Sequence, residues 1–361
     1  MGEQKNIPLI LLMYFILLFG LGCGLLDLTS LLPEQHTDLA PTPVMPSRTI
    51  ATGFTDRLLW CRGNVYIPHH SYPSPGLVAS RDYVTFANFL GGPIDEVNQL
   101  EVLDADTGDV SWQSERFPDY EDFTIIGDRV FVLLNRGSPL NIYIIGGDSQ
   151  PIHSLDYPKK DAKFYVYPAV LKGKLYIYYE LQGQYFLHQV EIGGGKMADP
   201  QRIQAATRPY ALFLFDQYFF LGDYSFAGSW NSLKTGQELW RISKLGQVET
   251  RPVLHDNNLI VSLGNSTDFF LLALNTGNGD ELWRTEEEFG ANIVMYKNSV
   301  YGLRTDAVLV KLDPLTGQPE EEIPFHPASI QPERWAYWLV TNGEELFIYF
   351  GDSQEVCALR D

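Results

Sequence analysis

Short apolar runs recur along the chain after about residue 50, and turn-forming residues separate them. Five such runs are VFVLL, LYIYY, ALFLF, LIVSL and LFIYF, which begin at residues 130, 175, 211, 259 and 346. Their β-branched and aromatic residues are typical of strands. Several runs are apolar at consecutive rather than alternate positions, which indicates strands covered on both faces. The pattern predicts an all-β chain made of small sheets that are each enclosed by neighbouring sheets.

A turn motif repeats between these runs. The copies are LDADTGDVSW from residue 103, NSLKTGQELW from 231, LALNTGNGDELW from 272 and KLDPLTGQPEEE from 311. In the first two copies, a Thr-Gly pair stands four residues before a tryptophan, namely Thr107, Gly108 and Trp112, then Thr235, Gly236 and Trp240. Glycine tolerates the positive φ of a tight hairpin, and tryptophan offers a large flat surface for packing between sheets.

The other two copies depart from this spacing. Gly279 lies four residues before Trp283, so we expect a two-residue insertion after Thr276–Gly277. In the last copy Gly317 remains, and Glu321 stands where tryptophan is expected.

The spacing of the tryptophans defines the repeat length. Trp240 and Trp283 are 43 residues apart, and Trp112 and Trp240 are 128 apart, which corresponds to three units of about this length. A four-stranded propeller blade takes about 40–50 residues. Two further blades, near 120–160 and 164–205, therefore fill the gap without the tryptophan.

These motifs resemble the repeats of the pyrroloquinoline-quinone (PQQ) type of β-propeller. The resemblance covers most of 51–361 and rests on the Thr-Gly and Trp pattern of the copies above. The layout of an export signal followed by such a propeller is similar to that of the barrel-assembly propeller lipoproteins of bacterial outer membranes.

The two ends of the body each carry half of a repeat. The chain ends in EVCALRD, like the strand before a Thr-Gly turn, and the body begins with TDRLLWC, like the strand after one. Joined, they make one blade in which Trp60 takes the place of Trp112, so the N- and C-terminal strands should pair and close the ring. The expected seven blades are 75–115, 120–160, 164–205, 208–245, 250–287, 289–325, and 333–361 together with 53–62.

Two cysteines fall at matching places in this composite blade. In the alignment with the first blade, Cys357 takes the place of Glu101 and Cys61 that of Gln113. Because these positions lie almost opposite each other on adjacent antiparallel strands, we predict a Cys61–Cys357 disulfide. The alternative is two buried free thiols, since an error of one residue in register would turn the side chains to opposite faces.

The N-terminus indicates export. Residues 7–26 are uncharged and follow Lys5. We interpret 1–26 as a lipoprotein signal with lipidation at Cys23, or else as an uncleaved membrane anchor or a secretory signal. Residues 27–50 contain four prolines and read as a tether, so that 51–361 form the propeller domain.

Charge and composition narrow the function. The formal net charge of −19 disfavours nucleic acid as a partner. The segment 104–109 (DADTGD) has acidic residues at alternate positions, as a calcium loop does, but lacks the later glutamate. His69–His70 would point to opposite faces of a strand, which disfavours a shared metal.

The sequence therefore predicts a non-catalytic, envelope-located scaffold that binds another protein, with no cofactor. Two alternatives stay open. The resemblance implies a PQQ-dependent quinoprotein dehydrogenase as one, although the chain has no vicinal cysteine pair and no assignable calcium set or base. The other is a sensor that binds a small ligand or carbohydrate in the central funnel.

Overall fold

The chain divides into two compact units, residues 1–47 and 48–361, and the fold described here belongs to the second unit. The computed structural model describes residues 54, 56–67, 76–89, 98–117, 122–133, 140–149, 151, 153–155, 163–164, 169–172, 174–190, 201–203, 209–223, 227–243, 246–248, 251–264, 269–285, 289–304, 306, 308–325, 337–351 and 353–360.

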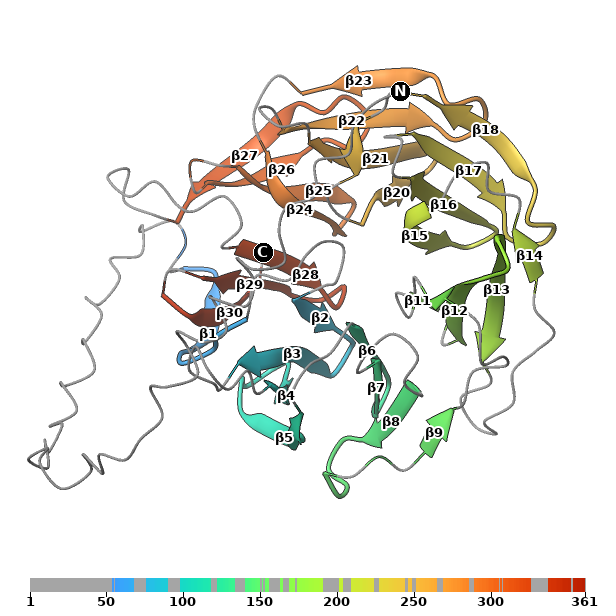
Figure 1. The fold of residues 1–361 in the computed structure, drawn as a ribbon. Coiled ribbons are helices and arrows are strands. Elements are labelled where there is room, and N and C mark those ends of the chain that lie inside the picture. The colour runs from blue at the N-terminus through green and yellow to red at the C-terminus, as the bar shows by residue number, and fades with distance from the viewer. Residues whose placement is uncertain are drawn as a thin grey trace, which may run out of the picture. The chain divides into compact units, whose positions relative to one another are not determined.

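The described strands form seven antiparallel sheets, numbered here as blades 1 to 7 (Figure 1). Blade 1 contains β2 (Leu77–Ala79), β3 (Tyr83–Phe89), β4 (Asn98–Asp104) and β5 (Val110–Phe117). Blade 2 contains β6 (Asp122–Ile126), β7 (Arg129–Leu133), β8 (Leu140–Ile144) and β9 (His153–Leu155). Blade 3 contains β10 (Lys163–Phe164), β11 (Ala169–Leu171), β12 (Lys174–Leu181), β13 (Gln184–Val190) and β14 (Gln201–Ile203). Blade 4 contains β15 (Pro209–Phe215), β16 (Tyr218–Asp223), β17 (Gly228–Ser232) and β18 (Glu238–Ile242).

The remaining blades complete the ring. Blade 5 contains β19 (Gln247–Val248), β20 (Val253–His255), β21 (Asn258–Gly264), β22 (Phe269–Asn275) and β23 (Glu281–Arg284). Blade 6 contains β24 (Phe289–Tyr296), β25 (Ser299–Arg304), β26 (Val308–Leu312) and β27 (Pro319–Pro324). Blade 7 contains β28 (Tyr337–Thr341), β29 (Leu346–Phe350), β30 (Glu355–Leu359) and, from the N-terminal end, β1 (Leu58–Arg62).

The blades follow one another around a closed ring. The first strands touch in series: β28 contacts β2, β2 contacts β6, β6 contacts β11, β11 contacts β15, and β20 contacts β24, which contacts β28. Blades 4 and 5 share a buried cluster that joins the remaining pair. The predicted seven-bladed, all-β propeller, with paired N- and C-terminal strands, is confirmed.

The first strand of blades 3 and 5 is broken into two pieces, so each of these blades has five strands. In blade 5, β19 and β20 both pair with β21, and Pro252 directly precedes β20. Proline has no N–H to donate to the ladder, which accounts for the interruption.

Packing between blades explains the consecutive apolar runs. All seven residues of β21 are buried. Leu259, Val261 and Leu263 pack with residues of blade 4, whereas Ile260 packs with residues of blade 6. Because successive side chains of a strand point to opposite faces, a strand enclosed on both sides has to be apolar throughout.

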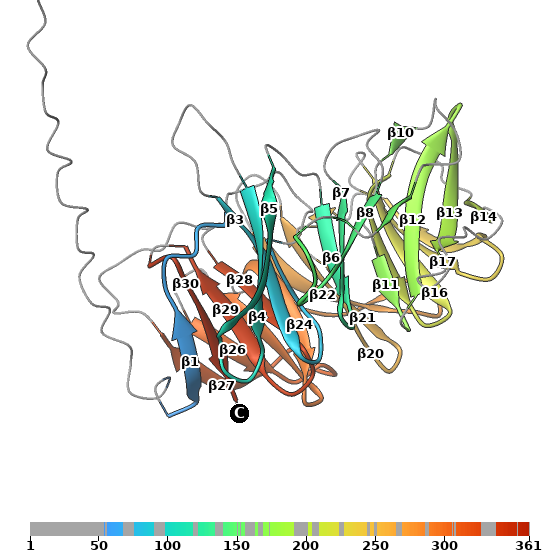
Figure 2. The same cartoon turned by 90° about the horizontal axis from the view of Figure 1, so that it is seen from below.

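The connections fall on two faces of the ring (Figure 2). The turns between the first and second strands lie beside those between the third and fourth; the Ala105 N–H, for example, donates to Asp82 O at 3.0 Å, and the Leu233 N–H to Gln217 O at 2.8 Å. We call this the turn face. The opposite face, at which β1 and β27 end and β2 and β28 begin, is called the loop face.

A β-bulge interrupts the outermost strand of five blades at the same place, directly before the tryptophan position. The extra residues are Leu59, Ser111, Leu239, Leu282 and Glu320. The three leucines are 41%, 50% and 45% exposed. A bulge bends an outer strand and makes it a poor template for pairing with another chain. The exposed leucines therefore follow from the bulge rather than from a misplaced core position.

Candidate functional site

A tryptophan on the outermost strand fastens one blade to the next at four seams among the described residues. In the seam between blades 7 and 1, Trp60 Nε1 donates to Ala105 O at 2.8 Å. The corresponding bonds are Trp112 Nε1 to Gly147 O at 3.2 Å, Trp240 Nε1 to Thr276 O at 2.7 Å and Trp283 Nε1 to Pro314 O at 3.1 Å. We call this arrangement the indole clasp.

In three clasps the indole lies directly against a glycine of the next blade. A Cβ at Gly108 would lie 2.6 Å from the ring of Trp60, and one at Gly317 would lie 2.5 Å from the ring of Trp283. Both glycines also have positive φ, +75° and +69°. The glycine of the motif therefore serves the turn and the seam at once.

The residues before the glycine build the turn itself. The Asp104 Oδ1 accepts hydrogen bonds from the N–H of Asp106 and from both the N–H and the hydroxyl of Thr107. The Thr107 Oγ1 in turn accepts the N–H of Asp109 at 3.2 Å. Thr235 repeats this role by accepting the N–H of Gln237 at 3.3 Å. The Asp104 carboxylate is thus part of the hairpin geometry, as is common for Asp in turns.

The expected insertion after Thr276–Gly277 is wrong. Gly279 has φ +79° and its N–H donates to Asn275 O at 2.7 Å, the same bond that Gly108 makes to Asp104 O. Asn278 takes the place of the threonine, because its Oδ1 accepts the N–H of Asp280 at 3.1 Å. The turn has the usual length, and an Asn-Gly pair replaces the Thr-Gly pair.

Glu321, at the tryptophan position of blade 6, makes a different seam. Its carboxylate accepts hydrogen bonds from both terminal nitrogens of Arg57, at 3.2 and 2.6 Å. Blade 7 has no Thr-Gly turn at this point, because its third strand, β30, and its fourth strand, β1, come from opposite ends of the propeller domain, which leaves a gap between them. The Arg360 N–H donates to Arg57 O at 2.9 Å across that gap. A two-pronged ion pair therefore replaces the indole clasp where the ring closes.

Cys61 and Cys357 form a disulfide in the same blade. They are direct partners in the pairing of β1 with β30, and their Cα atoms are 4.1 Å apart. The bond links residues 296 apart in the sequence. Cys357 is buried, whereas Cys61 is exposed on the outer strand. The register inferred from the alignment with blade 1 is therefore the register of the structure.

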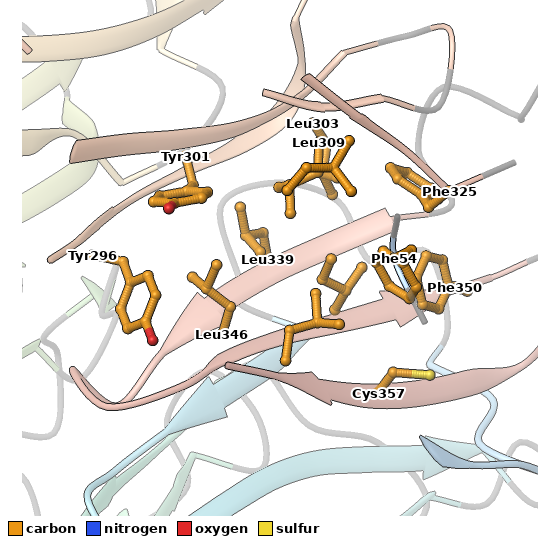
Figure 3. Close-up of a cluster of buried hydrophobic side chains, with 13 residues drawn as sticks. Phe54, Tyr296, Tyr301, Leu303, Leu309, Phe325, Leu339, Leu346, Phe350 and Cys357 are labelled. Carbon is orange, nitrogen blue, oxygen red and sulfur yellow. The ribbon is translucent and has the colours of Figure 1, made fainter. Parts of the chain in front are cut away.

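Buried groups near the closure reinforce it. Phe54, just before β1, is 1% exposed and packs against Phe325 and Phe350, with ring centroids 6.0 and 5.9 Å away (Figure 3). Glu345, 1% exposed, accepts hydrogen bonds from Arg360 and from Asn342. This carboxylate raises the pKa of the Arg360 guanidinium. Sequence reasoning missed these residues, because each follows from contacts between distant segments.

The loop face presents an aromatic side chain on a rigid segment beside blade 7. The backbone of residues 65–67 is fixed by three bonds: Val65 N–H to Gln354 O, Tyr66 N–H to Asn88 Oδ1 and Ile67 N–H to Tyr349 OH, at 2.9, 2.9 and 3.2 Å. Val65 and Ile67 are buried, and Tyr66 between them is 40% exposed. An exposed aromatic residue on an ordered backbone is the kind of group that protein interfaces use as an anchor.

The polar side chains beneath this segment are hydrogen-bonded or ion-paired to one another. Asn88, whose Oδ1 accepts the Tyr66 N–H, donates through its amide nitrogen to Glu101 Oε1 at 2.6 Å. Arg62 lies 3.8 Å from the same carboxylate. Glu101 is 5% exposed. Hydrogen bonds and an ion pair of this kind offset the free-energy cost of burying a carboxylate. Glu101 thereby links the end of β1 to blade 1.

Several sequence predictions fall outside the described residues. Cys23, the proposed signal or anchor 1–26, the tether 27–50 and His69–His70 belong to this group. Within the part of the chain that the structure describes, no helix has the length and apolar character of a membrane span.

Comparisons with known proteins agree with the fold. A family model described as outer membrane protein assembly factor BamB matches residues 229–337, from blade 4 into the start of blade 7. A search of curated proteins finds no match. The expected resemblance to PQQ-like propeller repeats, and to the barrel-assembly propeller, is confirmed.

Solved structures show the same architecture at low identity. BamB from Moraxella catarrhalis is 17% identical, with a TM-score of 0.53, over 80% of this chain and 85% of that one. The computationally designed Ika8 protein is 15% identical, with a TM-score of 0.53, over 83% and 100%. A chain of the mitotic checkpoint complex is 13% identical, with a TM-score of 0.62, over 94% and 99%. At these identities the likeness establishes the fold, and function has to be argued from the chain itself.

Proposed function

We propose that this protein is a non-catalytic scaffold of the cell envelope that binds another protein through the loop face beside blades 7 and 1. The observation that carries the proposal is Tyr66, held outward by a segment whose backbone is bonded to both blades. Binding residues are commonly found on loops that a rigid scaffold positions. A ring closed by strand pairing and a disulfide is such a scaffold.

Three features support a location outside the cytoplasm. The disulfide belongs to oxidising compartments. The uncharged run 7–26 has the length and apolar character expected of an export signal or an anchor. The family model that matches 229–337 describes an outer membrane assembly factor. We propose a lipid on Cys23, followed by the tether 27–50.

The net charge of −19 suggests what kind of partner the ring attracts. A strongly acidic protein steers basic surfaces toward itself and repels other acidic ones. We therefore propose a partner whose contact surface carries Lys or Arg around an apolar pocket that accepts the Tyr66 ring. Such binding weakens as salt is raised, because the long-range attraction is screened.

The test is cross-linking of the tagged full chain in its native membrane, followed by identification of the captured protein. The variant Tyr66→Ala should lose the captured partner by at least about tenfold, the size of effect that truncation of an interface anchor produces. Tyr218→Ala is the matched control, because Tyr218 is 37% exposed but lies on the turn face. Equal capture by both variants would contradict the proposed face.

The lipid and the absence of catalysis need separate tests. Cys23→Ala should abolish incorporation of labelled fatty acid; incorporation that persists, or a wild-type chain that is never labelled, would exclude lipidation at Cys23. Dye-linked oxidation of alcohols or sugars after addition of PQQ and Ca²⁺ addresses the quinoprotein alternative. Turnover that depends on the added PQQ would overturn the proposal that the ring is not an enzyme.

A further inference from the structure

The two halves of the Cys61–Cys357 disulfide differ in exposure. Cys357 is 1% exposed and lies in the buried cluster that contains Leu339 and Phe350 (Figure 3). Cys61 is exposed and lies on β1, the outermost strand of blade 7. Thiol–disulfide exchange requires access to the sulfur that is attacked. A thiol that approaches from solution therefore meets the bond at Cys61.

The disulfide does in blade 7 what a hairpin does in other blades. In blades 1, 4, 5 and 6 the third strand leads into the fourth through a turn, so the chain itself keeps the two strands together. β30 and β1 come from opposite ends of the domain, and the disulfide joins them across a separation of 296 residues. Closing so long a length of chain costs entropy. Opening the bond therefore leaves β1, a strand of five residues, held to β30 by noncovalent contacts.

β1 leads directly into the segment that presents Tyr66. Arg62, the last residue of β1, lies 3.8 Å from the Glu101 carboxylate. Glu101 accepts a hydrogen bond from the Asn88 amide at 2.6 Å, and Asn88 Oδ1 accepts the Tyr66 N–H at 2.9 Å. A continuous series of contacts thus connects the residue beside Cys61 to the backbone of Tyr66.

The start of β30 holds the same segment. The Val65 N–H donates to Gln354 O at 2.9 Å, and Gln354 directly precedes β30. The segment 65–67 therefore continues from one of the strands that the disulfide joins and is bonded beside the other. Its position depends on how β1 and β30 are placed relative to each other.

We infer that the Cys61–Cys357 disulfide is a thiol-exchange site, at which a protein dithiol opens the bond through Cys61 and so releases the Tyr66 segment. The effect on partner binding rests on the proposed function, whereas the exchange site and the release of the segment do not. Buried cysteines are inert and accessible ones react, which makes the exposed half of the bond the point of attack.

The step is an ordinary exchange in which the dithiol is the reductant. One thiolate of the dithiol attacks Cys61 Sγ and forms a new S–S bond, while the bond to Cys357 breaks and Cys357 Sγ takes the electron pair and then a proton. The second thiol of the same protein attacks its own sulfur in the mixed disulfide. Cys61 leaves as a thiol, and the dithiol ends as a disulfide.

Reduced glutathione, added in excess to the full natural chain without denaturant, tests the point of attack. Acid stops the exchange, and mass spectrometry of peptides locates the glutathione adduct. Adducts should lie on Cys61 in at least about tenfold excess over Cys357, because only the exposed half is accessible. Adducts mainly on Cys357, or a bond that opens only in denaturant, would overturn the inference.

Hydrogen exchange tests the release of the segment. In the chain reduced with dithiothreitol, the amides of residues 65–67 should exchange at least about tenfold faster than in the oxidised chain, while those of β21 and β22 in blade 5 keep their rates. Equal rates for 65–67 in the two forms would contradict the release. Equal acceleration in blade 5 would contradict it as well, because exchange would then report global unfolding.

Capture of the partner separates this inference from the proposed function. Cross-linking in the native membrane with Cys61→Ala and Cys357→Ala together should lower capture toward the level of Tyr66→Ala. Full capture by the double variant, where Tyr66→Ala loses the partner, would overturn the control by the disulfide and leave the proposed function intact. Full capture by Tyr66→Ala would instead contradict the proposed function, and the glutathione and hydrogen-exchange results would still decide the exchange site.

Discussion

Trp60 and Gly108, 48 residues apart in the sequence and in neighbouring blades, lie face to face, with room for a hydrogen atom but not for a methyl group between them. The indole also donates to Ala105 O in the same turn. The seam therefore depends on a glycine whose φ is positive and whose missing side chain leaves space for a ring.

Two glycine substitutions separate these requirements. Gly183 has the same φ as Gly108, +75°, and nothing lies within 4 Å of a Cβ placed there. Gly183→Ala should lower the free energy of unfolding by about 1 kcal/mol through backbone strain. Gly108→Ala should cost about 2 kcal/mol more, because the Trp60 ring has to move. Urea unfolding measures both; similar losses would argue against the seam role of Gly108.

The disulfide should contribute strongly to the closure. Replacement of Cys61 and Cys357 by alanine removes a constraint between residues 296 apart, which the chain-entropy account values at up to about 5 kcal/mol. We expect the double variant to unfold at clearly lower urea than the natural chain. Cys23→Ala is the control that leaves this bond intact. Recovery of both cysteines as free thiols in non-reducing peptide mapping would remove the basis of the prediction.

The glutamate at position 321 should resist replacement by the tryptophan of the repeat. Glu321→Trp places an indole where blade 7 has two separate segments, at Arg57 and Arg360, instead of a turn glycine, and it removes the carboxylate that binds Arg57. We expect a loss of about 1 kcal/mol or more in unfolding free energy. Arg57→Met, which removes the ion pair with Glu321 but keeps the glutamate, should cost about 1 kcal/mol or less and less still in high salt. A stabilised Glu321→Trp variant would refute this account of the closure.

Stability should fall at alkaline pH. Burial raises the pKa of Tyr143, Tyr176 and Tyr179, with the charge of Glu115 adding to the effect at Tyr143. In the unfolded chain these phenols ionise near pH 10, so the folded state binds protons more tightly. The contribution is complete below about pH 10 and is lost as pH rises above it, by up to about 1.4 kcal/mol per pH unit for each phenol.

Urea unfolding between pH 8 and 11, with phenolate absorbance recorded in parallel, measures this dependence. Tyr176→Phe should reduce the slope, because one such phenol is removed. An unfolding free energy that stays constant from pH 9 to 11 would contradict the raised pKa values. A slope unchanged in Tyr176→Phe would remove that residue from the explanation.

The sequence carries much of the fold because a blade is a local unit. The turn of 104–109 and its tryptophan lie within one hairpin, so spacing alone predicts them. Repetition extends the inference, since Trp60 and Cys61 could be placed by comparison with Trp112 and Gln113. The turn at 275–279 was misjudged because Thr276–Gly277 looks like the Thr-Gly pair of the motif. It stands two residues before Asn278–Gly279, the pair that occupies the motif position in the structure.

The sequence by itself determined the strands, the seven blades and the register that pairs Cys61 with Cys357. Only the tertiary structure decided which distant groups meet, as Arg57 does with Glu321 and Phe54 with Phe350. It also decided that Tyr66, whose N–H is bonded to Asn88, has an exposed side chain. The physical reason is the separation in sequence between the residues that are in contact. Hairpins and repeats are set by residues close in the chain, whereas a seam joins residues whose contact exists only after the ring has closed.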